Sequence, residues 1–160
     1  MEKRLKNVFL IVLLLISIIS CTNNVDSNSV RNYNSDLQLC TDLWNSYADL
    51  LKIGDPDSIG EKFTDDAIIV YTDIPDIMGK ENIQNLIKGI FPNTKMQKFD
   101  FSIKQFCVTD STVFIFINVK EKYLNSENIE YNSDARISTL WKLESDGEWK
   151  INLWQVNYKK

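Results

Sequence analysis

The sequence contains no histidine. Histidine is the most common general base near neutral pH and the most common metal ligand in proteins. Its absence excludes Ser-His and Cys-His nucleophile systems and most catalytic zinc sites. No other metal-ligand spacing, phosphate loop or nucleophile elbow is present, so we expect no metal and no other cofactor. Any acid–base chemistry would depend on Asp, Glu, Tyr or Lys.

Basic residues are too few to support a nucleic-acid partner. Residues 1–20 hold three of the 18 Lys and Arg and one of the 22 Asp and Glu, so residues 21–160 carry 15 basic and 21 acidic side chains and a net charge of −6. Phosphate binding needs a concentrated basic face, and the sequence shows none. We therefore expect no nucleic-acid partner.

Cysteine is also scarce, with three residues in the chain. Cys40 and Cys107 fall on different expected elements, and the sequence does not place them within bonding distance. Buried free thiols are the favoured interpretation, and a disulfide is the alternative.

One long apolar run stands near the N-terminus. Residues 8–19 (VFLIVLLLISII) are interrupted only by Ser17 and follow Lys3, Arg4 and Lys6. The run is shorter than the roughly 18–20 apolar residues that span a bilayer. A charged head, a short apolar core and a small residue after it are typical of an export signal.

The residues after this run give the protein its expected location. Ile18-Ile19-Ser20-Cys21 resembles the bacterial lipobox, in which a small residue precedes a lipidated Cys. The resemblance implies that residues 1–20 are a lipoprotein signal peptide and that Cys21 carries diacylglycerol. The protein would then be anchored to a membrane of the bacterial cell envelope, facing the periplasm or the exterior. An ordinary secretory signal with an incidental Cys is the alternative.

Two further segments follow Cys21. Residues 22–35 (TNNVDSNSVRNYNS) are rich in Asn and Ser and lack apolar periodicity, so residues 21–35 are predicted to be a lipidated Cys and a flexible tether. Such a tether has a reach of roughly 20 Å. Residues 36–160 have the size of one domain.

Helices are expected first in this domain. An apolar stripe at three- and four-residue steps predicts a helix up to Gly54, consisting of Leu37, Leu39, Cys40, Leu43, Trp44, Tyr47, Leu50 and Leu51. Asp55-Pro56 predicts a short second helix with Ile59 and Phe63 facing the core. Residues 67–71 (AIIVY) predict a strand, and residues 79–91 predict a third helix.

The second half of the domain is predicted to be a β-meander. Residues 96–108, 111–124, 129–143 and 148–158 are β-rich and are separated by Thr109-Asp110, an Asn-rich joint and Ser145-Asp146-Gly147. Helices followed by a meander indicate an α+β fold.

This order resembles the nuclear transport factor 2-like superfamily, which includes SnoaL-like cyclases and ketosteroid isomerases. The matching residues are Trp44, Tyr47, Gly54-Asp55, Phe63, Asp65-Asp66-Ala67, Gly79 and Ile83, then Trp141, Gly147, Trp149 and Trp154. The resemblance implies a cone: a curved, mostly antiparallel sheet with three N-terminal helices on its concave face and an apolar cavity inside. The candidate cavity residues are Trp44, Tyr47, Tyr71, Thr139, Trp141 and Trp154.

Ketosteroid isomerases use a Tyr donor on the first helix, an Asp base on the first strand and a second acid on a later strand. In this sequence the donor position is Tyr47, the base position is Tyr71 and the second acid position falls near Thr139. Without a base no proton can be abstracted, so steroid isomerisation is rejected. Arg136 alternates with Asp134 and Glu130, which indicates an exposed ladder; the alternative is a carboxylate-binding residue inside the cavity.

Three functions remain from the sequence. The favoured hypothesis is a membrane-anchored, non-catalytic module that binds a small apolar ligand in the cavity. The second is a SnoaL-like enzyme of isomerase, cyclase or hydratase type that uses Tyr47 and Tyr71 with an unidentified carboxylate. The third is a protein-interaction or dimerisation module with a filled cavity. Phe114 and Phe116 make one strand apolar on both faces, which favours a homodimer.

Overall fold

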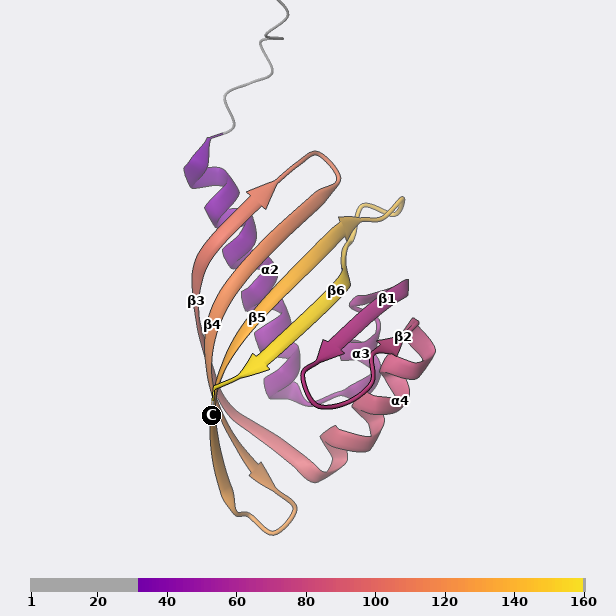
Figure 1. Cartoon of the computed structure of the whole chain (residues 1–160), viewed down its shortest axis with the longest axis vertical. Coiled ribbons are helices and arrows are strands. Elements are labelled where there is room, and N and C mark those ends of the chain that lie inside the picture. Colours follow the sequence, from indigo (N-terminus) through magenta and orange to yellow (C-terminus); the bar gives the residue numbers. More distant parts are fainter. Residues whose placement is uncertain (1–31, 160) are drawn as a thin grey trace, which may run out of the picture. The chain divides into compact units, whose positions relative to one another are not determined.

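The computed structural model describes residues 32–159, and the predicted signal peptide, Cys21 and the tether up to residue 31 lie outside them. The predicted α+β order is confirmed (Figure 1). In chain order the elements are α2 (Tyr33–Ile53), α3 (Pro56–Gly60), β1 (Phe63–Tyr71), β2 (Ile77–Met78), α4 (Lys80–Ile90), the 3₁₀ turn η1 (Phe91–Asn93), β3 (Thr94–Val108), β4 (Thr112–Asn125), β5 (Glu130–Leu143) and β6 (Trp149–Tyr158).

The long helix α2 forms because its apolar side chains recur on one face. Its buried residues are Cys40, Trp44, Tyr47, Ala48 and Leu51. It begins at Tyr33, three residues before the predicted domain start, so the last three residues assigned to the tether are helical.

A two-residue junction separates α2 from α3. Gly54 ends α2 with a φ of 75°, a value that costs glycine little. Asp55 then caps α3, because its carboxylate accepts a hydrogen bond from the Ser58 N–H at 3.2 Å, and Pro56 occupies the first turn. Phe63 was predicted on this short helix, and that prediction is wrong: Phe63 is the first residue of β1, where it is buried.

The strands form one six-stranded sheet in the order β2-β1-β6-β5-β4-β3. The pairs β3–β4, β4–β5 and β5–β6 are the predicted antiparallel meander, whereas β1 pairs parallel to β6. The two-residue strand β2 escaped prediction because it is too short to show alternation.

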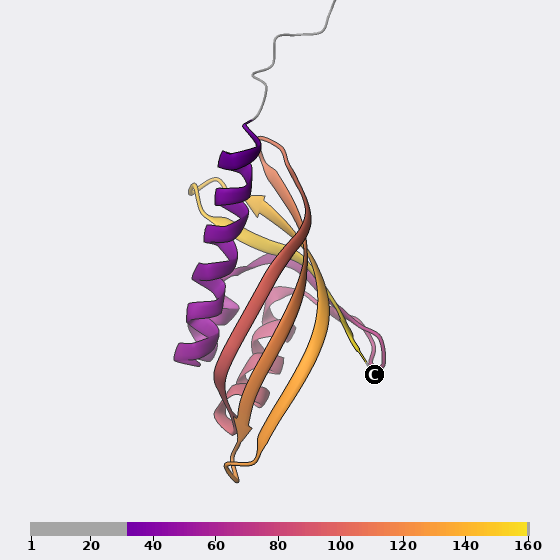
Figure 2. The same cartoon turned by 90° about the vertical axis from the view of Figure 1, so that its left-hand side faces the viewer.

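The sheet curves around the helices. Register shifts in β3 and β6 mark β-bulges, which bend a strand and increase its twist. All three helices lie on the inner side of the bend (Figures 1 and 2), in agreement with the predicted cone. The core between them includes Trp44, Ile115, Ile137, Trp141 and Ile151, each at most 1% exposed.

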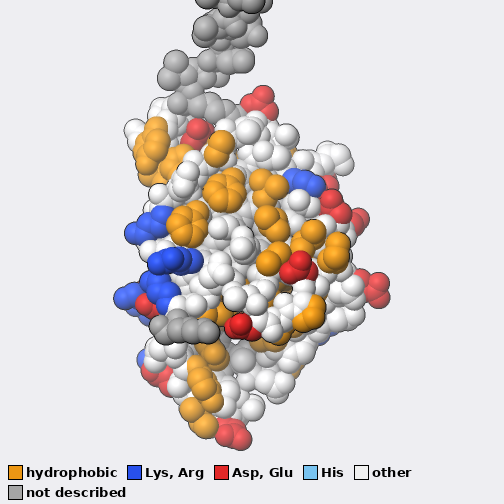
Figure 3. Space-filling model, viewed as in Figure 1, with side chains coloured by type: hydrophobic (Ala, Val, Ile, Leu, Met, Phe, Trp, Pro, Cys, Tyr) orange, Lys and Arg blue, Asp and Glu red, His pale blue; other side chains and the backbone are white. Residues whose placement is uncertain are grey.

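The outer face of the sheet carries a group of apolar side chains near its centre (Figure 3). Phe114 and Phe116 of β4 alternate with the fully buried Val113, Ile115 and Ile117 and are themselves partly buried. The homodimer stays a prediction.

Both described cysteines are free thiols. Cys40 is buried and Cys107 is exposed, so the expectation of two buried thiols is wrong for Cys107. Burial, with a contribution from Asp36, raises the pKa of the Cys40 thiol to about 11. Cys40 therefore stays protonated at neutral pH.

Among residues 32–159 no helix combines the length and the apolar character that crossing a bilayer requires.

Candidate functional site

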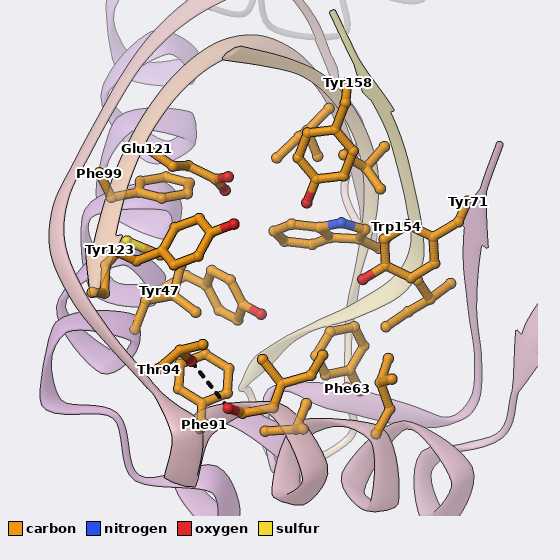
Figure 4. Close-up of a pocket in the computed structure, with 18 residues that line it drawn as sticks. Tyr47, Phe63, Tyr71, Phe91, Thr94, Phe99, Glu121, Tyr123, Trp154 and Tyr158 are labelled. Carbon is orange, nitrogen blue, oxygen red and sulfur yellow. Dashed lines mark hydrogen bonds between the residues drawn. The ribbon is translucent and has the colours of Figure 1, made fainter. Parts of the chain in front are cut away.

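A cavity opens between the curved sheet and the helices α2 and α4 (Figure 4). Its volume is about 250 Å³. At roughly 30 Å³ per molecule, this corresponds to about eight molecules of liquid water, so a fitting ligand is small. The lining residues are Tyr47, Leu51, Phe63, Ile69, Tyr71, Leu86, Ile87, Ile90, Phe91, Thr94, Met96, Phe99, Glu121, Tyr123, Ile137, Trp154, Val156 and Tyr158.

Strand β4 supplies two polar side chains of the cavity, because every second residue of a strand faces the same side of the sheet. On β4 the residues Val113, Ile115, Ile117 and Val119 face inward and are buried. The next two positions of the same parity are Glu121 and Tyr123, and both line the cavity. Strand β4 therefore continues past the packed core, and the inward-facing side chains of that last part line the cavity.

Among the described residues that line the cavity, Glu121 has the only ionisable carboxyl group. It pairs with Ser133 in the β4–β5 register, and the Ser133 hydroxyl donates a hydrogen bond of 2.6 Å to Glu121 Oε2. Burial raises the pKa of the Glu121 carboxyl, and the Ser133 hydrogen bond offsets part of that rise. The protonated form is therefore more accessible than for a carboxyl group in water.

Tyrosines from four elements surround this carboxylate. Tyr47 comes from α2, Tyr71 from β1, Tyr123 from β4 and Tyr158 from β6, and their side chains point into the cavity (Figure 4). Burial is the largest cause of a raised pKa at Tyr47, and Tyr71 and Glu121 add to it. Burial and then Glu121 also raise the pKa of Tyr71. The phenols of Tyr47 and Tyr71 therefore stay neutral and can both donate and accept hydrogen bonds.

Three of the six sequence-predicted cavity residues line the cavity: Tyr47, Tyr71 and Trp154. Trp44 lies in the core beside it, with its ring centroid 5.3 Å from that of Trp154 and 6.0 Å from that of Phe99. Trp44 therefore supports the cavity wall from behind.

Thr139 and Trp141 are buried in the same core and do not line this cavity. The Trp141 Nε1–H donates to Thr139 Oγ1 at 2.9 Å, and Thr139 Oγ1 donates to the Ile115 carbonyl at 3.4 Å. The polar groups of both side chains therefore have hydrogen-bond partners inside the core, as buried polar groups usually do.

Arg136 is exposed on the outer face of β5, paired in register with Asn118. Arg136 therefore belongs to an exposed ladder of charged side chains, which was the favoured interpretation of the sequence. The neighbouring acids of that ladder pair with lysines: Glu130 with Lys122 at 2.7 Å and Asp134 with Lys159 at 3.9 Å.

Sequence reasoning missed Glu121, although a signal for it existed. The alternation of Val113, Ile115 and Ile117 identifies the odd positions of β4 as inward-facing. Continued by four residues, the same alternation places Glu121 inside. Within residues 32–159 no group of three or more Cys, Asp or Glu side chains comes together as metal ligands would.

The chain has the nuclear transport factor 2-like fold that the sequence resemblance predicts. A ketosteroid isomerase-like protein from Erwinia carotovora atroseptica SCRI1043 superposes with a TM-score of 0.67 at 14% identity, covering 80% of this chain and 99% of that one. An NTF2-like protein from Cytophaga hutchinsonii ATCC 33406 gives 0.65 at 17% identity, covering 80% and 99%.

A third solved structure, from Novosphingobium aromaticivorans DSM 12444, carries a provisional assignment as a scytalone dehydratase. It gives a TM-score of 0.65 at 13% identity, covering 79% of this chain and 85% of that one. By sequence, the chain matches no protein-family profile and no curated protein. At these identities the likeness establishes the fold, and the function has to be argued from the cavity.

Proposed function

We propose that the domain is a binding module for one small, largely apolar molecule that carries a single polar group. The observation that supports the proposal is the cavity itself: an apolar lining interrupted by one cluster of polar groups, Glu121 and its surrounding tyrosines. Ligand sites in proteins typically combine apolar walls with a few convergent polar groups. The apolar walls would stabilise the body of the ligand, and the cluster would orient its polar group.

The test uses a cavity-blocking variant with a matched control. Ile90 lines the cavity and is 40% exposed, so Ile90→Trp should narrow the entrance without overpacking the core. Ile74 is 49% exposed and does not line the cavity, which makes Ile74→Trp the control. A bound probe at about hundredfold excess over its Kd should raise the wild-type Tm by about 5 °C or more.

The probes are 2-phenylethanol and 2-phenylethylamine, which fit the small volume and carry one polar group each. We expect at least one of them to raise the Tm of the wild type and of Ile74→Trp, and to have about tenfold weaker affinity for Ile90→Trp by calorimetry. If neither probe binds the wild type, or if Ile90→Trp binds as well as the control, the cavity is not a ligand site.

Glu121 also supports a second candidate function, an acid–base enzyme of the SnoaL-like type. A partly buried carboxyl with a raised pKa beside neutral tyrosines has the groups that proton transfer needs, and it supplies the carboxylate that the sequence left unidentified. The structural neighbours named as isomerase-like or dehydratase-type proteins agree with this candidate. The test is whether the protein converts a bound molecule into a product. If Glu121→Gln abolishes that conversion and still binds the molecule, the domain is an enzyme and not a binding module.

The location of the domain also belongs to this proposal. We expect cleavage before Cys21 and lipidation of that residue, which would keep the domain at a membrane of the cell envelope. A chain expressed with an alkyne-labelled fatty acid should take up the label, and Cys21→Ser should not. Equal labelling of the two chains would contradict lipidation at Cys21.

A further inference from the structure

The charge inside the cavity narrows the ligand class. Among the eighteen described residues that line it, Glu121 is the only charged side chain, and neither Lys nor Arg is present. An anionic ligand would therefore meet a carboxylate with no lining cation to compensate it. In a partly desolvated site that repulsion is much stronger than in water. Carboxylates and phosphates are consequently disfavoured.

The aromatic walls of the cavity, in contrast, favour a positively charged ligand. Eight of the same eighteen described residues are aromatic: Tyr47, Phe63, Tyr71, Phe91, Phe99, Tyr123, Trp154 and Tyr158. Aromatic rings attract cations through their quadrupole, and sites of this composition bind organic ammonium ions. The aliphatic lining residues, such as Leu86 and Ile137, suit the apolar body of such a molecule.

The carboxylate is also held in a position to bind. Ser133 occupies Glu121 Oε2, and no hydrogen bond from the described residues reaches Oε1. Figure 4 shows the carboxylate pointing into the cavity, toward the side on which Tyr158 and Trp154 lie. A ligand N–H can therefore donate to Oε1 without displacing the Ser133 hydroxyl, and the tyrosine hydroxyls can accept further N–H donors.

From this geometry we propose that the ligand is a small organic ammonium ion, with its charged nitrogen at Glu121 and its apolar part against the aromatic wall. This inference rests on the proposed binding function and names its ligand class. A cation compensates the buried carboxylate, which a neutral alcohol of the same size does not. The ammonium form should therefore be preferred over both neutral and anionic molecules of the same shape.

Three probes with a common ring test the preference: 2-phenylethylamine, 2-phenylethanol and phenylacetate. In calorimetry at pH 8 with the wild-type domain, we expect the amine to bind about tenfold or more tightly than the alcohol, and phenylacetate to bind weakest. Equal or tighter binding of the alcohol would overturn the ammonium proposal and leave the binding function intact. Binding of none of the three would overturn both.

Two variants locate the preference on Glu121. Glu121→Gln keeps the shape and removes the charge, so the amine should lose about tenfold in affinity while the alcohol changes little. Glu130→Gln removes a carboxylate outside the cavity and is the control. Circular dichroism should show that both variants are folded. If Glu121→Gln and Glu130→Gln bind the amine equally, the inference is wrong.

The pH dependence gives an independent readout. The groups that face Glu121 are Phe99 from β3, Ser133 from β5 and the hydroxyls of Tyr47, Tyr71, Tyr123 and Tyr158. Burial raises the pKa of Tyr47, Tyr71 and Tyr158 above the ordinary value of 10.0, so Glu121 is the acidic group among these that titrates below neutral pH. Amine affinity should fall as the pH is lowered through the raised pKa of Glu121, and alcohol affinity should not. A pH-independent amine affinity would contradict the proposal.

Discussion

Replacing Trp44 by Ala should lower the free energy of unfolding by about 3–5 kcal/mol, the usual cost of removing a large buried aromatic side chain. Trp44 is fully buried, and the ring centroids of Phe101, Phe99 and Trp154 lie 5.9, 6.0 and 5.3 Å from its own. A domain of this size has a total stability of about 5–15 kcal/mol. Urea unfolding followed by circular dichroism should therefore show a much lower midpoint, or no folded baseline.

A pair of milder variants separates packing from hydrogen bonding at this core. Trp44 and Trp141 are both at most 1% exposed. Within the described part of the chain the Trp44 Nε1–H has no hydrogen-bond partner, whereas that of Trp141 donates to Thr139. Trp141→Phe should therefore cost about 1 kcal/mol more than Trp44→Phe, because only the former breaks a buried hydrogen bond. Equal costs would show that the Trp141 hydrogen bond contributes nothing to stability.

Replacing Glu121 by Gln should stabilise the ligand-free domain at pH 8 by about 1–3 kcal/mol, the range for burying a polar group without full compensation. The folded-state pKa of Glu121 is raised above its ordinary value of 4.5 by burial. The protonated form therefore contributes stability that is fully present below about pH 4.5 and is lost as pH rises through the raised folded-state pKa. The difference between Glu121→Gln and wild type should thus grow with pH.

Glu130→Gln is a control with the opposite sign. Its hydrogen bonds from Lys122 and Asn132 lower the pKa of Glu130, so its carboxylate stabilises the fold above its ordinary pKa and loses that effect in acid. Chemical unfolding of wild type and both variants between pH 4 and pH 8 measures the two slopes. A Glu121→Gln difference that stays constant across this range would show that burial does not raise the pKa of Glu121.

The elements of the fold were predictable because their periods are unambiguous. The α2 stripe from Cys40 to Leu51 has helical spacing, and the long strands alternate with turn residues between them. The exceptions are local. Only two turn residues, Glu61 and Lys62, separate Phe63 from α3, so the start of its strand could not be told from the helix by pattern, and β2 has only two residues.

The cavity was only partly predictable. The sequence correctly placed Tyr47, Tyr71 and Trp154 in the cavity lining. It also placed Trp44 and Trp141 there, because they too are aromatic residues on inward-facing positions, but both are buried in the core behind the cavity wall. Whether an inward aromatic side chain lines a cavity or fills the core depends on how far the helices cover the sheet. The periodicity of apolar residues predicts which face of an element a residue lies on. It does not predict where the packed core ends and the cavity begins.

The parallel pairing of β1 with β6 has a consequence for how the protein is made. Thr72 and Asn157, joined by a hydrogen bond of 3.0 Å, are 85 residues apart in the chain. Closing so long a loop is entropically costly, and β1 has no long neighbouring strand until β6 has been synthesised. During synthesis from the N-terminus, β1 and the helices emerge before the strand that pairs with β1. We therefore expect β1 to complete its pairing only after β6, the ten-residue strand Trp149–Tyr158, has been made.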